Sequence, residues 1–159
     1  MVSVTAETLL NAGTIRVSDY RCTASRHDPV VSEVHQRFTI AYVRRGSFSC
    51  RTRGTTYELV RGSLLLGHPG DEYVCTHDHV VGDECLAFQL DDDVVDAIGA
   101  TSAWRSSAVP PLPELIVLGE LAQARRTSAP ISGSTRSGCG SPRASSGSPA
   151  TAARWFLSM

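Results

Sequence analysis

The stretch "HQRFTIAYVRRGSFSCRTRGTTYELVRGSLLLGHPGDEYVC", residues 35–75, decides the fold because it reads as short strands separated by turn residues. Glycine or proline stands near the ends of most of these strands, and no helical periodicity competes before residue 90. Five or six strands at this spacing predict an all-β sandwich or barrel. The expected strands are 37–44, 47–53, 56–60, 63–67, 73–79 and 85–90.

After residue 90 the pattern changes to two short helices. Residues 91–100 begin with three aspartates, which favour a helix N-terminus, and reach a glycine at Gly99. The segment "PPLPELIVLGELAQARR", residues 110–126, places Pro113 near a helix start. One face of this second helix carries Leu115, Leu118, Leu121 and Ala122. We therefore expect a barrel over residues 1–90 and a helical linker or dimerisation segment over residues 91–124.

The remaining residues, 125–159, differ in kind from the rest of the chain. They are rich in Ser, Gly, Pro, Ala, Thr and Arg, and they offer little to bury. Residues 1–120 carry a net charge of −6, whereas residues 121–159 carry +5 and no acidic residue. This composition predicts a disordered tail. The abrupt change inside an amphipathic helix also suggests the hypothesis that a frameshift or truncation removed the native continuation after about Gln123.

Length and composition exclude several classes of protein. The 159 residues are 42% hydrophobic, which suits one globular domain. The sequence lacks a run of about 18 apolar residues, the length needed to cross a bilayer, and residues 1–10 do not read as a signal peptide. We therefore expect a cytoplasmic protein whose five cysteines are thiols or ligands rather than a disulfide framework. The acidic folded part is by itself a poor surface for nucleic acid.

The strand block resembles the N-terminal sensory domain of AraC-type (AraC/XylS) transcription regulators over about residues 15–123. The matching features are a histidine before the first long strand, the segment "VRRGSFSCRTRG" (43–54) and the segment "YELVRGSLLLGHPGDEYVC" (57–75). The resemblance implies a mainly β, cupin-like barrel (a double-stranded β-helix, or jelly roll) followed by one or two short α-helices. It also implies a bacterial effector-sensing domain that binds a small molecule. The apolar face of the second helix would allow a homodimer.

In the AraC family two helix-turn-helix units bind DNA after the linker helix. Nothing after residue 123 of this sequence resembles a recognition helix. We therefore expect a sensing domain without its DNA-binding half, so that DNA would be contacted only through the missing domain. A non-functional truncated product is an alternative reading, because an apolar helix face would be left exposed.

The stretch "CTHDHVVGDEC", residues 75–85, suggests a metal site. Side chains alternate along a strand, so Cys75, His77 and His79 share a face, and a turn centred on Gly82 would place Cys85 opposite His79. Two thiolates and two imidazoles suit tetrahedral Zn²⁺. The predicted metal ligands are therefore Cys75, His77, His79 and Cys85. A turn at Gly82-Asp83 would instead pair Cys85 with Val80. The register of the hairpin therefore decides whether Cys85 lies on the same face as the two imidazoles. A metal-free rim hairpin and a Cys75–Cys85 disulfide remain alternatives.

A second reading of the same stretch gives an enzyme. "HDHVVGDE", residues 77–84, also fits the His-x-His-x₄-Glu ligand spacing of metal-dependent cupin enzymes, with Glu84 as the carboxylate. No histidine follows His79, so the set would need His35 from an earlier strand. The alternative function is therefore a small metal-dependent oxygenase or isomerase, and the sequence favours a non-enzymatic sensor over it.

Two residues are predicted to contact the effector. His35 precedes the first long strand and could point into the barrel, although an ordinary surface or core histidine is the alternative. Tyr42 shares a strand face with Phe38 and Ile40, so it either lines a pocket or fills the core.

Overall fold

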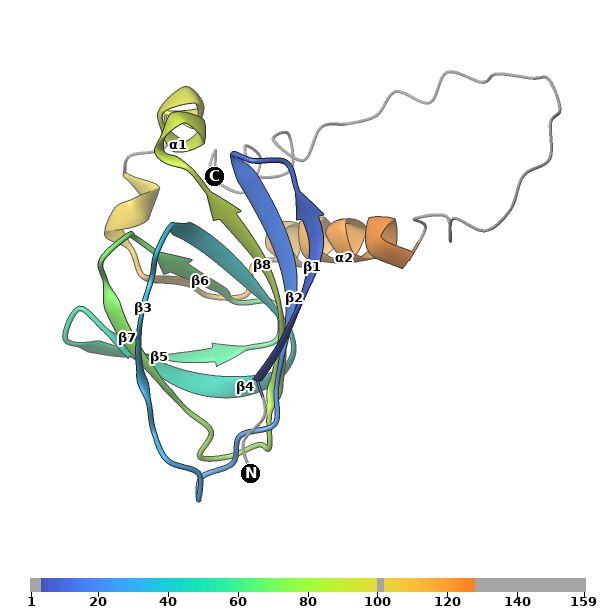
Figure 1. Ribbon diagram of the computed structural model, residues 1–159. Helices are drawn as coiled ribbons and strands as arrows, with labels where there is room; N and C mark the ends of the chain where they lie inside the picture. The colour runs from blue at the N-terminus through green and yellow to red at the C-terminus, as the bar shows by residue number, and fades with distance from the viewer. Residues whose placement is uncertain (1–3, 100–101, 128–159) are drawn as a thin grey trace, which may run out of the picture.

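The computed structural model describes residues 4–99 and 102–127, which form a β-barrel with helices packed on its outer side (Figure 1). The mainly β fold followed by short helices confirms the predicted fold class. The elements are β1 (Val4–Asn11), β2 (Ile15–Cys22), β3 (Ser32–Val34), β4 (Phe38–Thr52), β5 (Thr55–Val60), β6 (Leu64–Gly67), β7 (Glu72–Thr76), β8 (Asp83–Leu90), α1 (Asp92–Ile98), the 3₁₀ turn η1 (Ala103–Arg105), β9 (Ala108–Val109) and α2 (Pro113–Thr127).

Strand β4 organises the barrel because it belongs to both of its walls. Its first half pairs with β8 and β6, within the order β1-β2-β8-β4-β6-β9, and its second half pairs with β5 and β7. The expected break between residues 37–44 and 47–53 is wrong, since β4 runs unbroken for 15 residues. A register shift between Val43 and Arg45, followed by Gly46 at φ +77°, bends the strand instead of ending it.

The expected hairpin between residues 73–79 and 85–90 is also wrong. Strand β7 pairs with β3 and β4, whereas β8 pairs with β2 and β4. The chain therefore crosses from one wall of the barrel to the other between Thr76 and Asp83. Neither turn register considered for the final hairpin applies, because the two strands are not partners.

Two apolar clusters lie on opposite faces of the β2-β8-β4-β6 wall. The outer cluster joins the sheet to the helices, and the inner cluster fills the barrel between its walls. Alternation along the strands decides which residue belongs where. The outer cluster includes Val17, Ile40, Tyr42, Leu86, Phe88 and Leu115, and the inner cluster includes Ala41, Val43, Phe48, Cys50, Leu65, Cys85 and Ala87.

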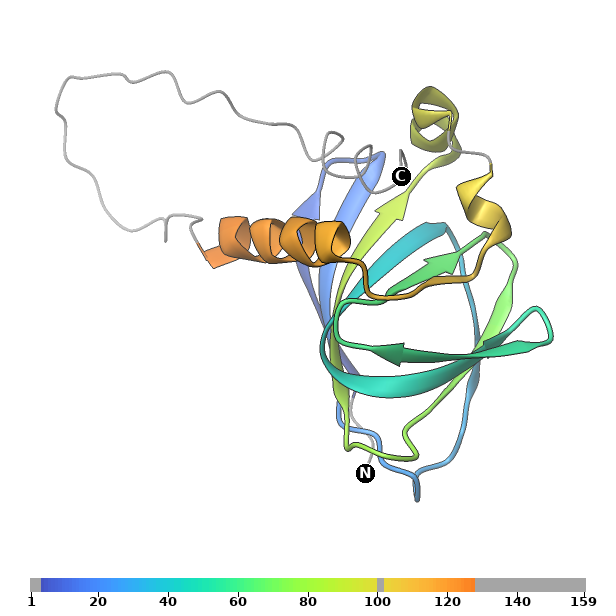
Figure 2. The same ribbon diagram turned by 180° about the vertical axis from the view of Figure 1, so that it is seen from behind.

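Helix α2 lies against the outer side of this wall (Figure 2). Leu115 is 2% exposed, and a Cβ at Gly119 would collide with the Tyr42 ring, so helix and sheet touch closely. The helix continues beyond Gln123 to Thr127, and the predicted disordered tail otherwise lies outside the described residues. No helix in the described part of the chain is long and apolar enough to span a membrane.

Candidate functional site

Polar side chains line the inner face at one end of the barrel. Arg16 pairs with Gln89 across β2 and β8, and Thr39 pairs with both Gln89 and Gly67 across β4. By strand alternation these residues share the inner face with Ala41, Leu65 and Ala87 of the inner cluster. We call Arg16, Thr39, Gln89 and His35 the polar row.

His35 reaches the polar row from the segment between β3 and β4. Its ring fills the space that a side chain at Gly67 would occupy, and it stacks on Tyr73 with ring centroids 4.2 Å apart. His35 is 7% exposed, and burial lowers the pKa of its ring against a weaker opposing effect of Asp71. The ring is therefore held in its neutral form. The structure thus places this predicted effector residue inside the barrel.

Two buried nitrogen atoms in the polar row have no hydrogen-bond partner within the described chain. They are Nε of Arg16 and Nε2 of His35. A buried polar atom without a partner is costly, so such atoms are satisfied by water or by a bound molecule. The row therefore offers an unused donor from arginine on β2 and an unused ring nitrogen from histidine beside Gly67 on β6, with Gln89 and Thr39 between them.

The structure places Tyr42 away from the polar row. Tyr42 has no exposed surface and packs in the outer cluster, where its hydroxyl group donates to Oε1 of Glu120 on α2 at 3.5 Å. Burial, reinforced by Glu120, raises the pKa of the phenol. Tyr42 consequently contacts the helix on the outer face, in agreement with the alternative that it fills the core. Its role as an effector contact stays a prediction.

The opposite end of the barrel holds a cluster of metal-ligand side chains. One ligand atom each from Cys22, His77 and Asp83 lies within 4.8 Å of the others. Nε2 of His77 lies 2.6 Å from Oδ1 of Asp83, and the Cys85 thiol donates to Oδ2 of Asp83 at 3.2 Å. Burial raises the pKa of both thiols, with a smaller contribution from Asp83. The chain therefore contains a possible Cys/His/Asp metal-binding group.

The structure separates the four ligands predicted from the sequence. His77 and Cys85 both lie beside Asp83, but His79 is exposed. Cys75 pairs with Cys50 across β4 and β7, and its hydrogen bond to Cys50 together with burial raises the pKa of the Cys75 thiol. Within the described ranges, His77 is the only one of these four residues whose ligand atom lies close to two other candidate ligand atoms, those of Cys22 and Asp83. Binding of an ion by all four stays a prediction.

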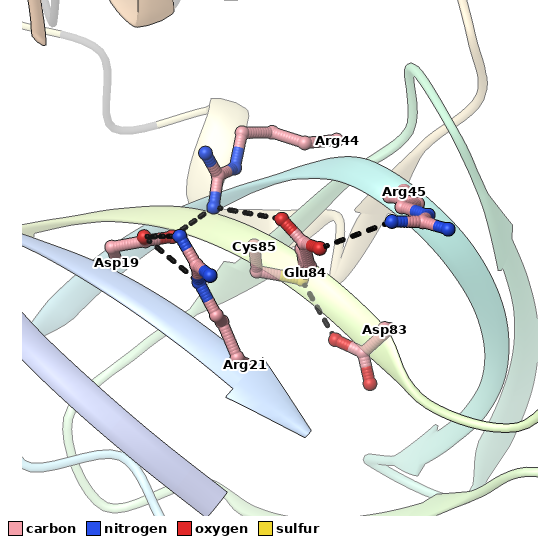
Figure 3. A network of polar contacts seen from close by, with 7 residues as sticks. All are labelled: Asp19, Arg21, Arg44, Arg45, Asp83, Glu84 and Cys85. Atoms are coloured by element: carbon pink, nitrogen blue, oxygen red, sulfur yellow. Dashed lines mark hydrogen bonds and ion pairs between the residues drawn. The ribbon is translucent and has the colours of Figure 1, made fainter. Parts of the chain in front are cut away.

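Glu84, the carboxylate of the alternative enzyme site, points to the outer face of the sheet. Figure 3 shows it between two arginines, with Oε2 3.5 Å from Arg44 and Oε1 3.7 Å from Arg45. Its neighbours Asp83 and Cys85 point inward, as strand alternation requires. Glu84 and His77 therefore do not converge, and the His-x-His-x₄-Glu spacing does not form one site here.

Five residues of the two candidate sites were not predicted from the sequence: Arg16, Thr39 and Gln89 of the polar row, and Cys22 and Asp83 beside His77. Cys22 lies far along the chain from the "CTHDH" segment, and only the pairing of β2 with β8 brings it opposite Asp83. The sequence does show that Cys22 and Asp83 stand at the ends of strand-like segments. That signal does not reveal which strands are neighbours.

A protein-family comparison identifies the domain. The model of the AraC-like ligand-binding domain matches residues 20–141, which is more than half of the chain. The chain belongs to this family. The predicted resemblance to the sensing domain of AraC-type regulators is confirmed, and no curated protein matches the sequence.

Solved structures of low sequence identity resemble this AraC-like ligand-binding domain, and several of them are described as cupins. A cupin superfamily protein from Desulfitobacterium hafniense is 14% identical, with 57% of this chain and 79% of that chain covered and a TM-score of 0.47. The cupin domain of Cnp3 from Schizosaccharomyces pombe is 10% identical, with coverages of 62% and 71% and a TM-score of 0.47. KdgF from a Halomonas species is 15% identical, with coverages of 57% and 82% and a TM-score of 0.46.

Proposed function

We propose that this domain is the effector-sensing part of an AraC-type transcription regulator and that its effector binds at the polar row. The observation that carries the proposal is the pair of buried, unpartnered nitrogens, Nε of Arg16 and Nε2 of His35. A guanidinium group and an imidazole together suit a small molecule that bears a carboxylate or several hydroxyl groups. The family membership supports a ligand-binding role rather than catalysis.

In this proposal the effector signals through strand β4 to helix α2. Ala41 faces the barrel interior and Tyr42 faces the helix, so neighbouring residues of one strand touch the two regions. Gly119 lies directly on the Tyr42 ring, which leaves little room for the strand to move without moving the helix. A coupling free energy of about 1–3 kcal/mol is typical of such regulation.

We further propose a homodimer formed through the exposed apolar side of α2. Val117 and Leu121 are 59% and 57% exposed there. We propose that DNA is contacted only through a helix-turn-helix domain. We also propose a cytoplasmic location, because Cys22, Cys50, Cys75 and Cys85 are all thiols. Light scattering of the purified chain tests the dimer, and a monomer at all concentrations would contradict it.

Zinc is the cofactor that we propose for the soft side chains near His77. Thiolate and imidazole ligands favour Zn²⁺ among common cellular metals. The set Cys75, His77, His79 and Cys85 is one arrangement for it. Two observations argue against that set: His79 is exposed, and Cys75 forms a hydrogen bond with Cys50.

A thermal-shift screen tests the effector site. The purified chain is heated with defined panels of pentoses and hexoses, mono- and dicarboxylates, and phosphate esters, and the melting temperature is recorded. We expect a carboxylate or polyol to stabilise the chain, by about 2.7 kcal/mol at a hundredfold excess over Kd. Arg16→Gln and His35→Gln should remove that stabilisation, whereas the exposed controls Arg45→Gln and His27→Gln should keep it. Stabilisation that survives both site variants would place the effector elsewhere.

A further inference from the structure

We propose that Cys22, His77 and Asp83 form a zinc-binding site at the end of the barrel opposite the polar row. The two ends are distinct, because Asp83 and Gln89 stand six residues apart on β8, or about 20 Å at 3.3 Å per residue. The site therefore goes beyond the effector pocket proposed above. Its ligands also differ from the set that the sequence predicts, since only His77 is shared.

The three side chains supply the donor types that zinc prefers. Sulfur, imidazole nitrogen and carboxylate oxygen come from three different segments, and their ligand atoms lie within 4.8 Å of one another. A small inward movement of side chains brings such a group to zinc-ligand distances of about 2.0–2.3 Å. Three protein ligands leave a fourth tetrahedral position for water or another small ligand.

The backbone holds two of these ligands in place before any metal binds. Cys22 and Asp83 are direct partners in the β2–β8 register. Next to them Gly82 donates its N–H to the carbonyl of Ala24 at 2.8 Å, and a Cβ at Gly82 would collide with the carbonyl oxygen of Cys22. The chain segments around residues 22–24 and 82–83 are therefore packed against each other. The spacing of the two backbone positions that carry the sulfur and the carboxylate is fixed, and only the side chains need to move.

Cys85 acts in this site as a positioning residue. Its thiol donates to Oδ2 of Asp83 at 3.2 Å, while Oδ1 of the same carboxylate faces Nε2 of His77 at 2.6 Å. The carboxylate is therefore oriented with Oδ1 toward the other ligands. Outer hydrogen bonds of this kind commonly fix the ligands of metal sites.

Solvent can reach the site from one side. A cavity of about 60 Å³ lies between residues 24–30 and the end of β7, and His77 forms part of its wall. This volume exceeds the roughly 10–15 Å³ that one water molecule needs. When Zn²⁺ binds, the Cys22 thiol proton leaves to solvent. His77 carries its single N–H on Nδ1 so that Nε2 can coordinate, and no oxidant or reductant takes part.

Metal titration tests the site in the full chain. The purified protein is stripped with a chelator, and Zn²⁺ is then titrated against a chromogenic competitor. Co²⁺ serves as a spectroscopic substitute, because a thiolate ligand gives a charge-transfer band and tetrahedral geometry gives strong visible bands. Circular dichroism of each variant checks that the barrel is folded.

We expect one zinc ion per chain and a thiolate-to-cobalt band that disappears in Cys22→Ser. His77→Ala should also abolish stoichiometric zinc binding, whereas Cys85→Ser should keep the band and lower affinity by about 10–100-fold. The matched controls Cys75→Ser and His79→Ala should bind zinc as the unchanged chain does.

Three results would overturn the proposal. One is the absence of stoichiometric zinc binding by the folded chain. Another is a thiolate band that survives in Cys22→Ser. The third is a metal that is lost in Cys75→Ser or His79→Ala but still bound in Cys22→Ser. That result would favour the ligand set predicted from the sequence.

Discussion

Arg44 and Asp19 form an ion pair that is almost fully buried on the outer face of the sheet, with side chains 4% and 1% exposed (Figure 3). Arg21 also binds Oδ2 of Asp19, at 3.2 Å, and Glu84 lies 3.5 Å from Arg44. The pair sits just beyond the outer apolar cluster, since Asp19 is the register partner of Leu86. Its two charges are therefore withdrawn from water and depend on each other.

Removing one charge of this pair should destabilise the fold strongly. Asp19→Asn leaves the buried Arg44 guanidinium with only its 3.5 Å contact to Glu84, and loss of a buried partner costs about 3–5 kcal/mol. Urea unfolding of the chain measures the change. The matched control is Arg45→Gln, because Arg45 is 82% exposed and contacts the same network only through Glu84. Equal losses in both variants would contradict the structural difference between the two arginines.

Replacing both members of the pair should be much less harmful than replacing one. The double variant Asp19→Leu with Arg44→Met removes both charges and keeps apolar volume in their place. Paired replacements of this kind are often neutral or stabilising. A double-variant cycle by urea unfolding measures the coupling, and simple additivity of the two single losses would show that the residues do not interact.

Two glycines with similar backbone angles should respond differently to alanine. Gly46 and Gly54 have φ +77° and +75°, but a Cβ at Gly46 meets the backbone of Gly82 and Asp83, whereas Gly54 has open space. Gly54→Ala should cost about 1–2 kcal/mol from the left-handed conformation alone. Gly46→Ala should cost about 1–3 kcal/mol more, because the backbone must shift. Thermal unfolding compares the two, and equal values would contradict the close contact.

Alanine at Gly119 should destabilise α2 although alanine normally favours a helix. In an open helix the change would gain about 1 kcal/mol. Here the new Cβ would collide with the Tyr42 ring, so we expect a loss of about 1–3 kcal/mol and faster amide hydrogen exchange in α2 than in β4. Val117→Ala, at a position 59% exposed, serves as the control with little effect. A stabilised Gly119→Ala would show that the helix does not rest on Tyr42.

The free energy of unfolding should fall in mild acid because of His35. Burial lowers the pKa of this ring in the folded chain from the ordinary value of 6.5. The unfolded chain therefore takes up a proton as the pH drops below about 6.5, whereas the folded chain does not, so stability falls until the pH reaches the folded pKa. The slope is at most about 1.4 kcal/mol per pH unit.

Urea unfolding between about pH 7.5 and about pH 5, a range that spans the ordinary histidine pKa, measures this slope in the presence of a chelator. His35→Gln should reduce it, and the exposed control His27→Gln should not. An unchanged slope in His35→Gln would mean that this ring titrates alike in the folded and unfolded chains.

The strand pattern of residues 35–75 was enough to predict a β-barrel followed by helices. The expected strand over residues 73–79 was correct only in part: Cys75 lies on β7, which ends at Thr76, so His77 and His79 lie beyond the strand. The prediction was wrong about which strands pair with each other. Their adjacency in the chain predicts that residues 73–79 pair with residues 85–90. In the structure β7 pairs with β3 and β4, and β8 pairs with β2 and β4. Adjacent strands are often partners, and a barrel with crossing connections is an exception.

The sequence by itself determined most of the strands between residues 38 and 90, the two helices and the gathering of soft ligands near His77, because these features depend on residues close together in the chain. Only the tertiary structure decided that Cys22 and Asp83 join His77, and that Arg16 and His35 belong to one cross-strand row at the other end of the barrel. The reason is physical: burial of the two apolar clusters selects which strands lie side by side. That selection involves the whole barrel, so no local stretch of sequence can reveal it.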